Sequence, residues 1–348
     1  MPIDRELIKK KLNFLDQHLS KIEKMELDEK EFVENSDIHD LITFRLQQAV
    51  AVTSADKREI AKQLEDANII AGVPFVIPSI ANAKSLKWIH SFSASVEKVL
   101  TDEVVKSKMI VSNSSGIHIT PIAEHVLGFM LIFTRRFYDT FKKQQKKIWE
   151  ANQNLTELRG KTALVVGLGH IGKEVGRLAS CFGAHVIGIK HNLKNKSSTN
   201  SVLDKPDFVD KLYSSDQLDE ALPKADFIVL CLSLTSETNH LFDMKKLRRM
   251  KRSAVLINIG RGGVVNEKEL IEALTKKIIG GAALDVTEEE PLPKESKLWN
   301  MENVIITPHH SGWSEKYMDR AIDLFCANLK SYLVNKPLPN FVDKKRGY

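Results

Sequence analysis

Arg261 has the chemistry and the surroundings of a residue that binds an anion. It follows an apolar run and lies between glycines in INIGRGGVV, which leaves the guanidinium room and lets a ligand approach. A planar cation with five donors can hold a carboxylate in a fork and polarise the carbonyl beside it. A surface arginine in an ion pair is the alternative, but flanking glycines do little for such a pair. We therefore favour a ligand-binding role.

A histidine and a group of acids lie further along. His309 follows a proline in VIITPHHSGW, and ALDVTEEEP supplies Asp285, Glu288, Glu289 and Glu290. A lone histidine is usually structural, and most of a glutamate run is usually solvated surface. With a carboxylate partner, however, a histidine can donate a proton at neutral pH, because the negative charge favours the imidazolium. His309 is therefore a candidate proton donor.

Residues 161–190, KTALVVGLGHIGKEVGRLASCFGAHVIGIK, have the pattern strand, glycine turn, helix, strand. The turn has the spacing G-x-G-x-x-G. Its first glycine permits a tight turn, the second lets a pyrophosphate approach the backbone, and the third lets helix and strand pack closely. The free N–H groups of the helix then face the phosphates. The pattern predicts a dinucleotide site at Gly167, Gly169, His170, Ile171 and Gly172.

The end of the second strand bears on which dinucleotide binds. An acid about 20 positions past the glycines would bind the ribose hydroxyls of NAD. Here Lys190 takes that place, and His191, Lys194 and Lys196 follow it. A positive field suits the extra phosphate of NADP, so we favour NADP(H) over NAD(H). A solvated basic loop is the alternative.

Composition indicates an ordinary soluble protein. The chain has 348 residues, 43% of them apolar, and a formal net charge of +6 that is spread along it. Such charge favours anionic ligands without indicating nucleic-acid binding. The three cysteines, Cys181, Cys231 and Cys326, lie in apolar patterns without metal-ligand spacing, so we expect buried free thiols and no metal site. Without a signal peptide or a membrane-spanning run, we expect a cytoplasmic protein with no membrane contact.

Short apolar runs alternate with amphipathic stretches from residue 51 onward. The expected strands are 51–53, 68–71, 86–91, 109–112, 164–166, 186–189, 227–232, 254–259 and 280–285, and the expected helices are 56–64, 119–136, 244–250 and 267–274. This alternation predicts an α/β fold with a doubly wound parallel sheet. Ligands of such sheets bind at the carboxyl ends of the strands, where Arg261 and His309 are expected to lie.

Residues 1–50 differ from the rest, because their leucines and isoleucines recur at helical spacing without a strand. The segment from DRELIKKKLNFL to ITFRLQQAV resembles the opening helices of HepT-type HEPN proteins. The Arg and His motif of that family's RNase has no counterpart here. We therefore interpret residues 1–50 as an atypical helical extension or dimerisation element.

Residues 52–340 resemble the D-isomer-specific 2-hydroxyacid dehydrogenase family. The matching stretches are IAEHVLGFML, KTALVVGLGHIG, LSLTSETNHLF, INIGRGGVVNEKEL, GGAALDVTEEEPLP and NVIITPHHSG. The resemblance implies that Arg261 binds the substrate carboxylate, that His309 is the acid/base with Glu290 as its carboxylate partner, and that Asp285 holds the nicotinamide carboxamide. It further implies dinucleotide contacts at Cys231, Leu232, Ser233, Ile259 and Gly260, and substrate contacts at Ala94 and Ser95.

The family also implies an organisation and a partner. We expect a Rossmann cofactor domain at 114–308, a smaller split α/β substrate domain at 51–113 and 309–348, and the helical segment at 1–50. A homodimer built largely through the cofactor domains is implied as well. This chain departs from the pattern where SASVEK stands for a typical SAGVD, so that Ser95 replaces a glycine, and where Ser233 replaces a proline. An N-terminus without the usual first strand-and-helix unit is a third departure.

Three functions follow from these features. We favour an oxidoreductase in which NADPH gives a hydride to a small 2-oxo acid, forming the D-2-hydroxy acid, while His309 protonates the forming alkoxide. An NAD-dependent enzyme resembling phosphoglycerate dehydrogenase is the second. A dinucleotide-sensing protein that has lost turnover through its altered N-terminus is the third.

Overall fold

The computed structural model describes residues 67–72, 83–191, 205–344 and 347. Its contacts divide the chain into two compact units. We call residues 118–314 the central unit, and the described residues up to Ile117 together with those from Glu315 onward the split unit. The expected helical segment 1–50, the strand 51–53 and the helix 56–64 lie outside the described residues.

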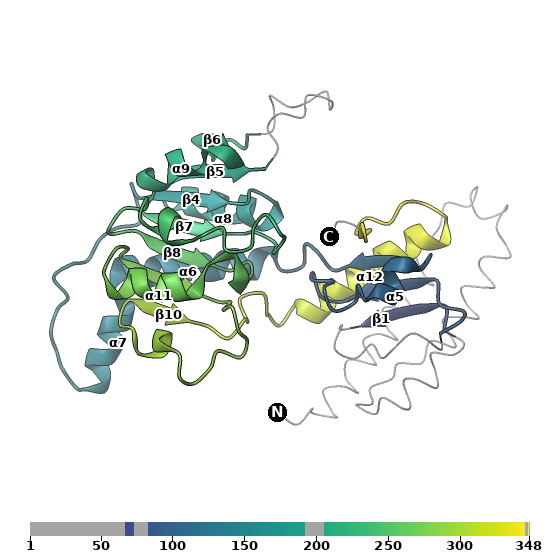
Figure 1. Ribbon diagram of the computed structural model, residues 1–348, viewed down its shortest axis with the longest axis horizontal. Helices are drawn as coiled ribbons and strands as arrows, with labels where there is room; N and C mark the ends of the chain where they lie inside the picture. The colour runs from purple at the N-terminus through teal and green to yellow at the C-terminus, as the bar shows by residue number, and fades with distance from the viewer. Residues whose placement is uncertain (1–66, 73–82, 192–204, 345–346, 348) are drawn as a thin grey trace. The chain divides into compact units, whose positions relative to one another are not determined.

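The central unit is built on a seven-stranded, wholly parallel sheet with the order β10-β9-β8-β7-β4-β5-β6 (Figure 1). The strands are β4 (Thr162–Val166), β5 (His185–Lys190), β6 (Lys211–Ser214), β7 (Phe227–Leu230), β8 (Val255–Asn258), β9 (Gly281–Leu284) and β10 (Val304–Ile306). The predicted parallel α/β sheet is therefore confirmed. The strand β6 was not predicted, because KLYS is short and begins with an exposed lysine.

Helices cover both faces of this sheet because alternate side chains of a strand point to opposite faces. In β4, Leu164 and Val166 enter one apolar core, and Ala163 and Val165 enter the other. The first core contains α9 (Leu218–Ala221), α10 (Met244–Leu247) and α11 (Glu267–Thr275), and the second contains α6 (Ile119–Arg135) and α8 (His170–Cys181). Short 3-10 helices lie at Ser215–Gln217, Leu222–Lys224, Gly262–Val264 and Lys297–Asn300.

The order of the strands reverses between β4 and β7. The chain runs outward from β4 to β5 and β6, then returns to the other side of β4 for β7 to β10. The loops that follow β4 and β7 both begin at this point. Where they begin, the Cys231 N–H donates to the Val166 carbonyl at 2.9 Å. Ligands of open α/β sheets bind at such a reversal, outside the carboxyl ends of the strands. The dinucleotide motif therefore begins where this topology places a ligand.

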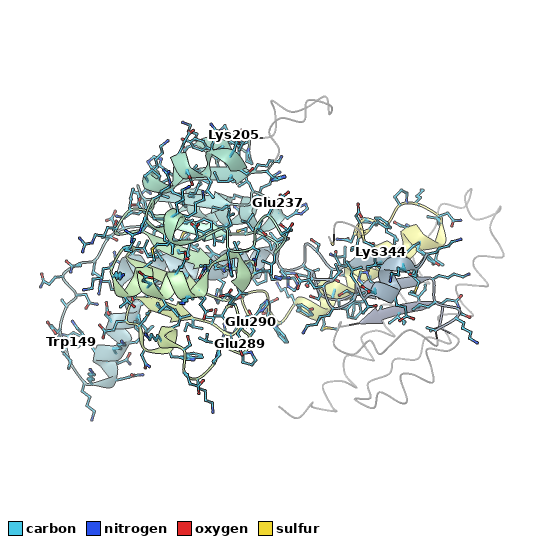
Figure 2. All side chains as sticks on the ribbon, viewed as in Figure 1. Trp149, Lys205, Glu237, Glu289, Glu290 and Lys344 are labelled. Carbon is cyan, nitrogen blue, oxygen red and sulfur yellow. The ribbon has the colours of Figure 1, made fainter. Side chains whose placement is uncertain are left out.

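A helical extension follows α6. Arg136 ends α6 in the left-handed conformation with φ of 52°, and α7 (Phe137–Gln145) then leads away from the sheet, as Figure 1 shows. Exposed apolar side chains gather on α7 and on the loop after it: Phe137, Phe141, Ile148, Trp149 and Leu155. Figure 2 shows Trp149 at the far end of this segment. Sequence reasoning did not predict α7.

The split unit contains a parallel sheet in which β2 lies between β1 and β3. Its elements are β1 (Ile69–Gly72), β2 (Trp88–Ser91), α5 (Asp102–Lys106), β3 (Ile110–Asn113) and α12 (Tyr317–Leu333). The ring of Trp88 stacks on Phe325 and Tyr332 of α12. After α12 the chain returns to the end of α5, where the Lys344 ammonium donates to three backbone carbonyls at 2.8–3.1 Å (Figure 2). The C-terminal segment thus completes this unit.

Two further expectations are tested by the described residues. All three cysteines are free, but Cys181 is exposed at the end of α8, so the prediction that all three are buried was wrong. Phe182, the apolar residue that follows Cys181, is exposed as well. Among the residues that the structure describes, no helix is both long and apolar enough to cross a membrane.

Candidate active site

The glycine turn has a shape that only glycine can adopt at two of its three positions. Gly167 follows β4 with φ of +100°, and a Cβ there would lie 2.6 Å from the Cys231 carbonyl oxygen. A Cβ on Gly172 would lie 2.2 Å from the carbonyl oxygen of Gly167. Both distances are far below van der Waals contact, so any side chain would push the backbone apart. These glycines hold strand, turn and helix together.

Gly169 differs, because no atom lies within 4 Å of the position that its Cβ would take. It is the N-cap of α8, a helix of 12 residues with no side-chain cap and no acid in its first turn. Exposed His170 and half-buried Ile171 begin that helix. The first N–H groups of a helix lack partners inside it and attract anions. An open, uncapped helix start at the reversal of the sheet fits the pyrophosphate of a dinucleotide.

Lys190 ends β5, where an NAD-binding chain would carry an acid. Its side chain is half-buried, it lies opposite Ser214 on β6, and exposed His191 follows it. Lys194 and Lys196 lie outside the described residues. In the part of the chain that the structure describes, the end of β5 therefore presents basic residues and no carboxylate of its own.

The loops after β7 and β8 form the next part of the predicted dinucleotide site. Cys231 and Leu232 are half-buried and Ser233 is exposed. Burial raises the pKa of the Cys231 thiol to about 12, so this group stays neutral. After Ile259, a Cβ on Gly260 would lie 2.4 Å from the Leu232 carbonyl oxygen, which makes glycine necessary for the two loops to pack.

Arg261 is held in its turn by the last residue of β8. The Asn258 side-chain amide donates to the Arg261 carbonyl at 3.0 Å, and its oxygen accepts the Gly260 N–H at 3.2 Å. The Arg261 Nη1 donates to the Gly260 carbonyl at 2.7 Å. Next to it, a Cβ on Gly262 would lie 1.8 Å from the Thr287 carbonyl oxygen. The arginine turn therefore packs directly on the loop that follows β9.

His309 and Glu290 form a pair, with 2.7 Å between Nδ1 and Oε2. The other carboxylate oxygen of Glu290 accepts the Thr287 N–H at 3.2 Å. His309 adopts the left-handed conformation, with φ of 49°. Because a carboxylate only accepts, Nδ1 carries the proton of this bond, and Nε2 is the atom that can exchange a proton with a ligand. Figure 2 shows Glu290 beside Glu289 on its loop.

Some of the predicted catalytic residues contact one another directly, and others are connected only through neighbouring residues. His309 contacts Glu290 directly, and Arg261 is connected to that pair through the packing of Gly262 on Thr287 and the bond from Thr287 to Glu290. Asp285 is buried below the turn that carries His309, with 2% exposure. Sequence reasoning missed Thr307, whose hydroxyl contacts the Asp285 carboxylate, and His125, whose ring contacts that hydroxyl. Both lie in stretches that had been recognised as motifs, IAEHVLGFML and NVIITPHHSG.

Ala94 and Ser95 lie in the split unit, in the loop after β2. The Ser95 N–H donates to the Ser93 hydroxyl at 3.2 Å, and the Asn113 side-chain amide donates to the Ala94 carbonyl at 2.8 Å. Ser95 is not among the described non-glycine residues with positive φ. The serine therefore fits this backbone without the strain that a left-handed position would impose.

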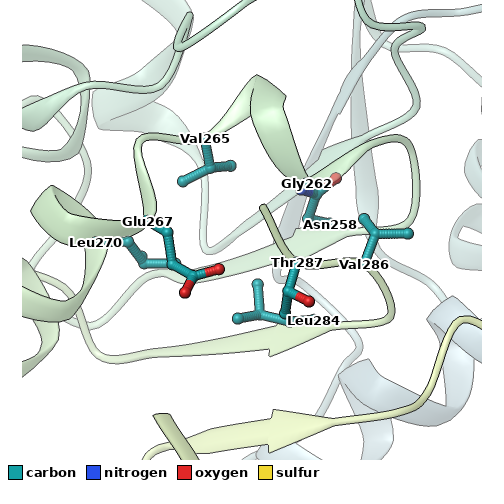
Figure 3. A pocket seen from close by; sticks show the side chains of 8 residues that line it. All are labelled: Asn258, Gly262, Val265, Glu267, Leu270, Leu284, Val286 and Thr287. Atoms are coloured by element: carbon teal, nitrogen blue, oxygen red, sulfur yellow. The ribbon is translucent and has the colours of Figure 1, made fainter. Parts of the chain in front are cut away.

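A small cavity is lined by Asn258 and Gly262, which flank the Arg261 turn in the sequence, and by Thr287 of the loop after β9 (Figure 3). Its walls are mainly apolar, and the Glu267 carboxylate points into it. This carboxylate also accepts the Glu288 N–H at 3.0 Å, while the Glu288 carboxylate accepts the Glu267 N–H at 3.3 Å. Burial, with neighbouring glutamates adding to it, raises the pKa of Glu267. Arg261, Glu290 and His309 are not lining residues, so the cavity is separate from the predicted chemistry.

Comparisons with known proteins agree with these features. Residues 127–311 match the family model of the D-isomer specific 2-hydroxyacid dehydrogenase, NAD binding domain. A glyoxylate reductase of Thermofilum pendens is 33% identical over 76% of each chain. A solved D-isomer specific 2-hydroxyacid dehydrogenase family protein of Aeromonas salmonicida has a TM-score of 0.74, with 28% identity over 89% of this chain and 96% of the other.

A third relative was solved with a dinucleotide bound. It is the NADPH-dependent glyoxylate/hydroxypyruvate reductase of Sinorhizobium meliloti in complex with NADP and sulfate. Its TM-score is 0.69, with 27% identity over 80% of this chain and 87% of the other. These relatives are thus similar to this chain over most of its length, and not only at the glycine turn after β4.

Proposed function

The chain belongs to the D-isomer-specific 2-hydroxyacid dehydrogenase family, whose members are NAD(P)-dependent oxidoreductases acting on CH–OH groups, and we propose that it reduces small 2-oxo acids with NADPH. The observation that carries the proposal is the His309–Glu290 pair at 2.7 Å, on the loops that follow β9 and β10. A histidine held in this way has one nitrogen fixed by a carboxylate and the other available for proton transfer. Membership of the family was predicted from the motifs and is confirmed.

The cofactor preference rests on the end of β5. Gly167, Gly169 and Gly172 would hold the pyrophosphate at the start of α8, and Lys190 with His191 would meet the adenosine phosphate of NADP. The NADP-bound relative from Sinorhizobium meliloti supports the same choice for a related protein. When bound, NADPH supplies the hydride for the carbonyl carbon of the substrate.

The protein's own residues would bind and protonate the substrate. Arg261 would hold the carboxylate of the 2-oxo acid and stabilise negative charge on the neighbouring oxygen. The Nε2–H of His309 would donate its proton to that oxygen, while Glu290 keeps Nδ1 protonated and the ring oriented. Asp285 would hold the nicotinamide carboxamide. The backbone N–H group of Ala94 would add a donor for a carboxylate, and that of Ser95 would do so by exchanging its bond to the Ser93 hydroxyl.

We propose that these roles belong to the two domains expected from the sequence, a dinucleotide-binding domain at residues 114–308 and a split substrate domain at 51–113 and 309–348. The division of the described chain into compact units at 117/118 and 314/315 supports this proposal. Three free cysteines are compatible with the reducing cytoplasm, where we place the protein.

We also propose a homodimer through the central unit. Phe137, Phe141, Ile148 and Trp149 are exposed together on α7 and its loop, and such a patch on a protein surface marks an interaction site. Light scattering should give twice the chain mass for the full-length protein, and Phe141→Glu combined with Trp149→Glu should give the single-chain mass. A wild-type protein that remains monomeric would contradict this assembly.

The first test is NADPH oxidation, followed by absorbance, with glyoxylate, hydroxypyruvate and bulkier 2-oxo acids, run beside NADH. His309→Ala should lower kcat by about 100- to 10,000-fold, because general acid catalysis contributes that much, with the Kd for NADPH nearly unchanged. His185→Ala, which changes an exposed histidine at the start of β5, is the matched control and should retain activity.

Other outcomes would select the alternatives. Turnover that requires NADH and a phosphorylated 2-oxo acid would favour an enzyme resembling phosphoglycerate dehydrogenase. Dinucleotide binding without turnover of any of these acids would favour a sensing protein. Equal kcat in His309→Ala and the wild type would contradict the role given to His309.

A further inference from the structure

Asp285 organises the turn that carries His309. Its backbone carbonyl accepts the His309 N–H at 2.8 Å. Its carboxylate accepts the N–H groups of His310 and Ser311 at 3.1–3.2 Å. His309 lies between these contacts in the left-handed conformation, which non-glycine residues adopt only when their surroundings hold them there. The Asp285 carboxylate therefore holds the backbone that follows His309 directly.

A hydroxyl and an imidazole hold that carboxylate in turn. The Thr307 hydroxyl lies 2.6 Å from Oδ1 of Asp285, and Nε2 of His125 lies 3.2 Å from the same hydroxyl oxygen. Thr307 comes directly after β10, and His125 projects from α6, where its ring meets Phe129 edge-on at 4.4 Å between centroids. The chain of contacts thus links the core helix α6 to the loop of His309.

The direction of these hydrogen bonds is fixed by elementary chemistry. An ionised carboxylate has no proton to donate, so Thr307 donates its hydroxyl proton to Asp285. The Thr307 oxygen must then accept from His125, which places a proton on Nε2 of that imidazole. Burial, the largest cause, lowers the pKa of His125, so its ring is neutral at pH 7 and carries its single proton at Nε2. Each link therefore has a defined donor and acceptor.

We propose that His125 and Thr307 are positioning residues of the reaction, which act through Asp285 on the turn that places His309. This inference rests on the proposed function, because it assigns His309 the proton transfer. In this proposal the Thr307 hydroxyl and the His125 ring act through Asp285 and not on the substrate or cofactor. They keep one oxygen of Asp285 in place, and that oxygen holds the backbone on the C-terminal side of His309.

The same cluster has the composition of a metal site. His125, Asp285 and His310 offer ligand atoms that all lie within 4.8 Å of one another. Ligands around a tetrahedral Zn²⁺ are about 3.4 Å apart, so the site would have to contract. A metal would also compete with the hydrogen bonds that already occupy Oδ1 of Asp285 and Nε2 of His125. The observed bonds favour the positioning role, and metal binding becomes an outcome of the test.

The kinetic test is Thr307→Val in the full-length protein, which removes the hydroxyl and keeps the shape of the side chain. We expect kcat with glyoxylate to fall about 10- to 100-fold, as for a displacement of a reacting group by about 1 Å. The Kd for NADPH should change by a smaller factor, because Asp285 would be one dinucleotide contact among several. Thr307→Ser restores the hydroxyl and should recover kcat to within about threefold. Thr275→Val removes an exposed hydroxyl on α11 and is the matched control, with unchanged kinetics.

A second measurement needs no turnover. Nitrogen-15 NMR of the histidine rings, with His125 assigned through His125→Gln, should show a neutral His125 protonated at Nε2 at pH 7. A protein without turnover would refute the proposed function, while this spectrum would still test the hydrogen-bond chain. A proton on Nδ1 of His125, an unchanged kcat in Thr307→Val, or stoichiometric Zn²⁺ binding that removes the Nε2 proton would each overturn the inference.

Discussion

The central and split units fill their sheets with different kinds of side chain. In the central unit, β7 consists of buried apolar residues throughout, and β8 ends in a single buried asparagine. In the split unit, β2 is also wholly buried, yet two of its four residues, His90 and Ser91, are polar. Parallel strands covered on both faces are normally continuous apolar runs. The middle strands of the central unit are therefore held mainly by apolar packing, whereas β2 of the split unit also depends on a buried polar cluster.

Hydrogen bonds satisfy that cluster only if His90 is neutral. Ser114 donates its hydroxyl proton to the Ser91 carbonyl at 3.0 Å, so its oxygen accepts from Nε2 of His90 at 3.3 Å. The Trp88 indole N–H donates to the Ser112 hydroxyl oxygen at 2.8 Å, and that hydroxyl donates to Nδ1 of His90 at 2.7 Å. A proton on Nδ1 would displace the Ser112 proton. The two units should accordingly respond to different perturbations.

The largest effect should come from Gly172→Ala in the central unit. The new Cβ would lie 2.2 Å from a backbone oxygen and 2.9 Å from a Val165 methyl group, with no flexible atom to yield on the backbone side. We expect the free energy of unfolding of the central unit to fall by at least about 3 kcal/mol, with loss of dinucleotide binding. Calorimetry and NADPH fluorescence measure the two effects.

Gly128→Ala is the matched control for this prediction. Gly128 also lies in a helix of the central unit, but no atom is within 4 Å of its Cβ position. Alanine should there stabilise the helix by up to about 1 kcal/mol, because glycine loses more backbone entropy on folding. Equal stability of the Gly172→Ala and Gly128→Ala proteins would show that the glycine turn can relax and that packing is less restrictive than the contacts indicate.

The split unit should instead be sensitive to acid. Burial lowers the pKa of His90 from 6.5 to about 4. Between pH 6.5 and pH 4, His90 is therefore protonated in the unfolded chain and neutral in the folded unit. Stability from this group is complete above pH 6.5 and falls as the pH drops towards 4, by about 3 kcal/mol in total. Urea unfolding of the split unit, followed through buried Trp88 between pH 7 and pH 4, measures the slope.

Two substitutions sharpen this prediction. His90→Asn keeps a donor and an acceptor but cannot take up a proton, so the unfolding free energy of the split unit should vary less with pH. His185→Asn changes a histidine of the central unit whose side chain is 65% exposed, and it should leave the slope unchanged. A wild-type slope that survives in His90→Asn would place the acid sensitivity in another group.

Strands of both units were predicted from the sequence, with β6 as an exception, but the polar contacts of the split unit were not, and the reason is physical. Runs such as LVV and AVLINI predict buried strands, and Gly167 and Gly172 are required by backbone contacts that tolerate no side chain. In the split unit, WIHS mixes polar and apolar residues because its polar groups are satisfied by Ser112 of β3 and by Ser114 just after it, 22 to 24 residues further on. Local patterns do not reveal such partners.

The candidate site shows the same division. Arg261, Glu290 and His309 lie in motifs, and their order in the sequence follows the strand ends of a parallel sheet. Thr307 and His125 were missed because their role depends on a contact across 182 residues, which places a helix residue beside the end of β10. Motif residues could therefore be predicted from type and spacing, whereas the residues that hold them in place required the fold.

The smallest expected effect concerns Glu267, which titrates in the opposite sense to His90. Burial raises the pKa of Glu267, so its contribution to stability is complete below its ordinary pKa and is lost as the pH rises through the raised value. Glu267→Gln keeps the oxygen that accepts the Glu288 N–H and removes the charge. We expect the free energy of unfolding of the central unit to rise by less than about 1 kcal/mol at pH 7 and to stay unchanged at pH 4.

Glu272→Gln on the same helix should do the reverse. Its exposed carboxylate pairs with Lys276 at 2.7 Å, and that hydrogen bond lowers the pKa of Glu272, so removal of the charge should cost a little stability at pH 7. Denaturant unfolding of both proteins at pH 7 and pH 4 separates the two signs. If Glu267→Gln instead destabilises the central unit at pH 7, the ionised Glu267 carboxylate must strengthen the contact between α11 and the loop of Glu290. The stability of each unit would then depend on the protonation state of one side chain, Glu267 in the central unit and His90 in the split unit. The two units would differ in how many polar groups they bury, and not in whether they need them.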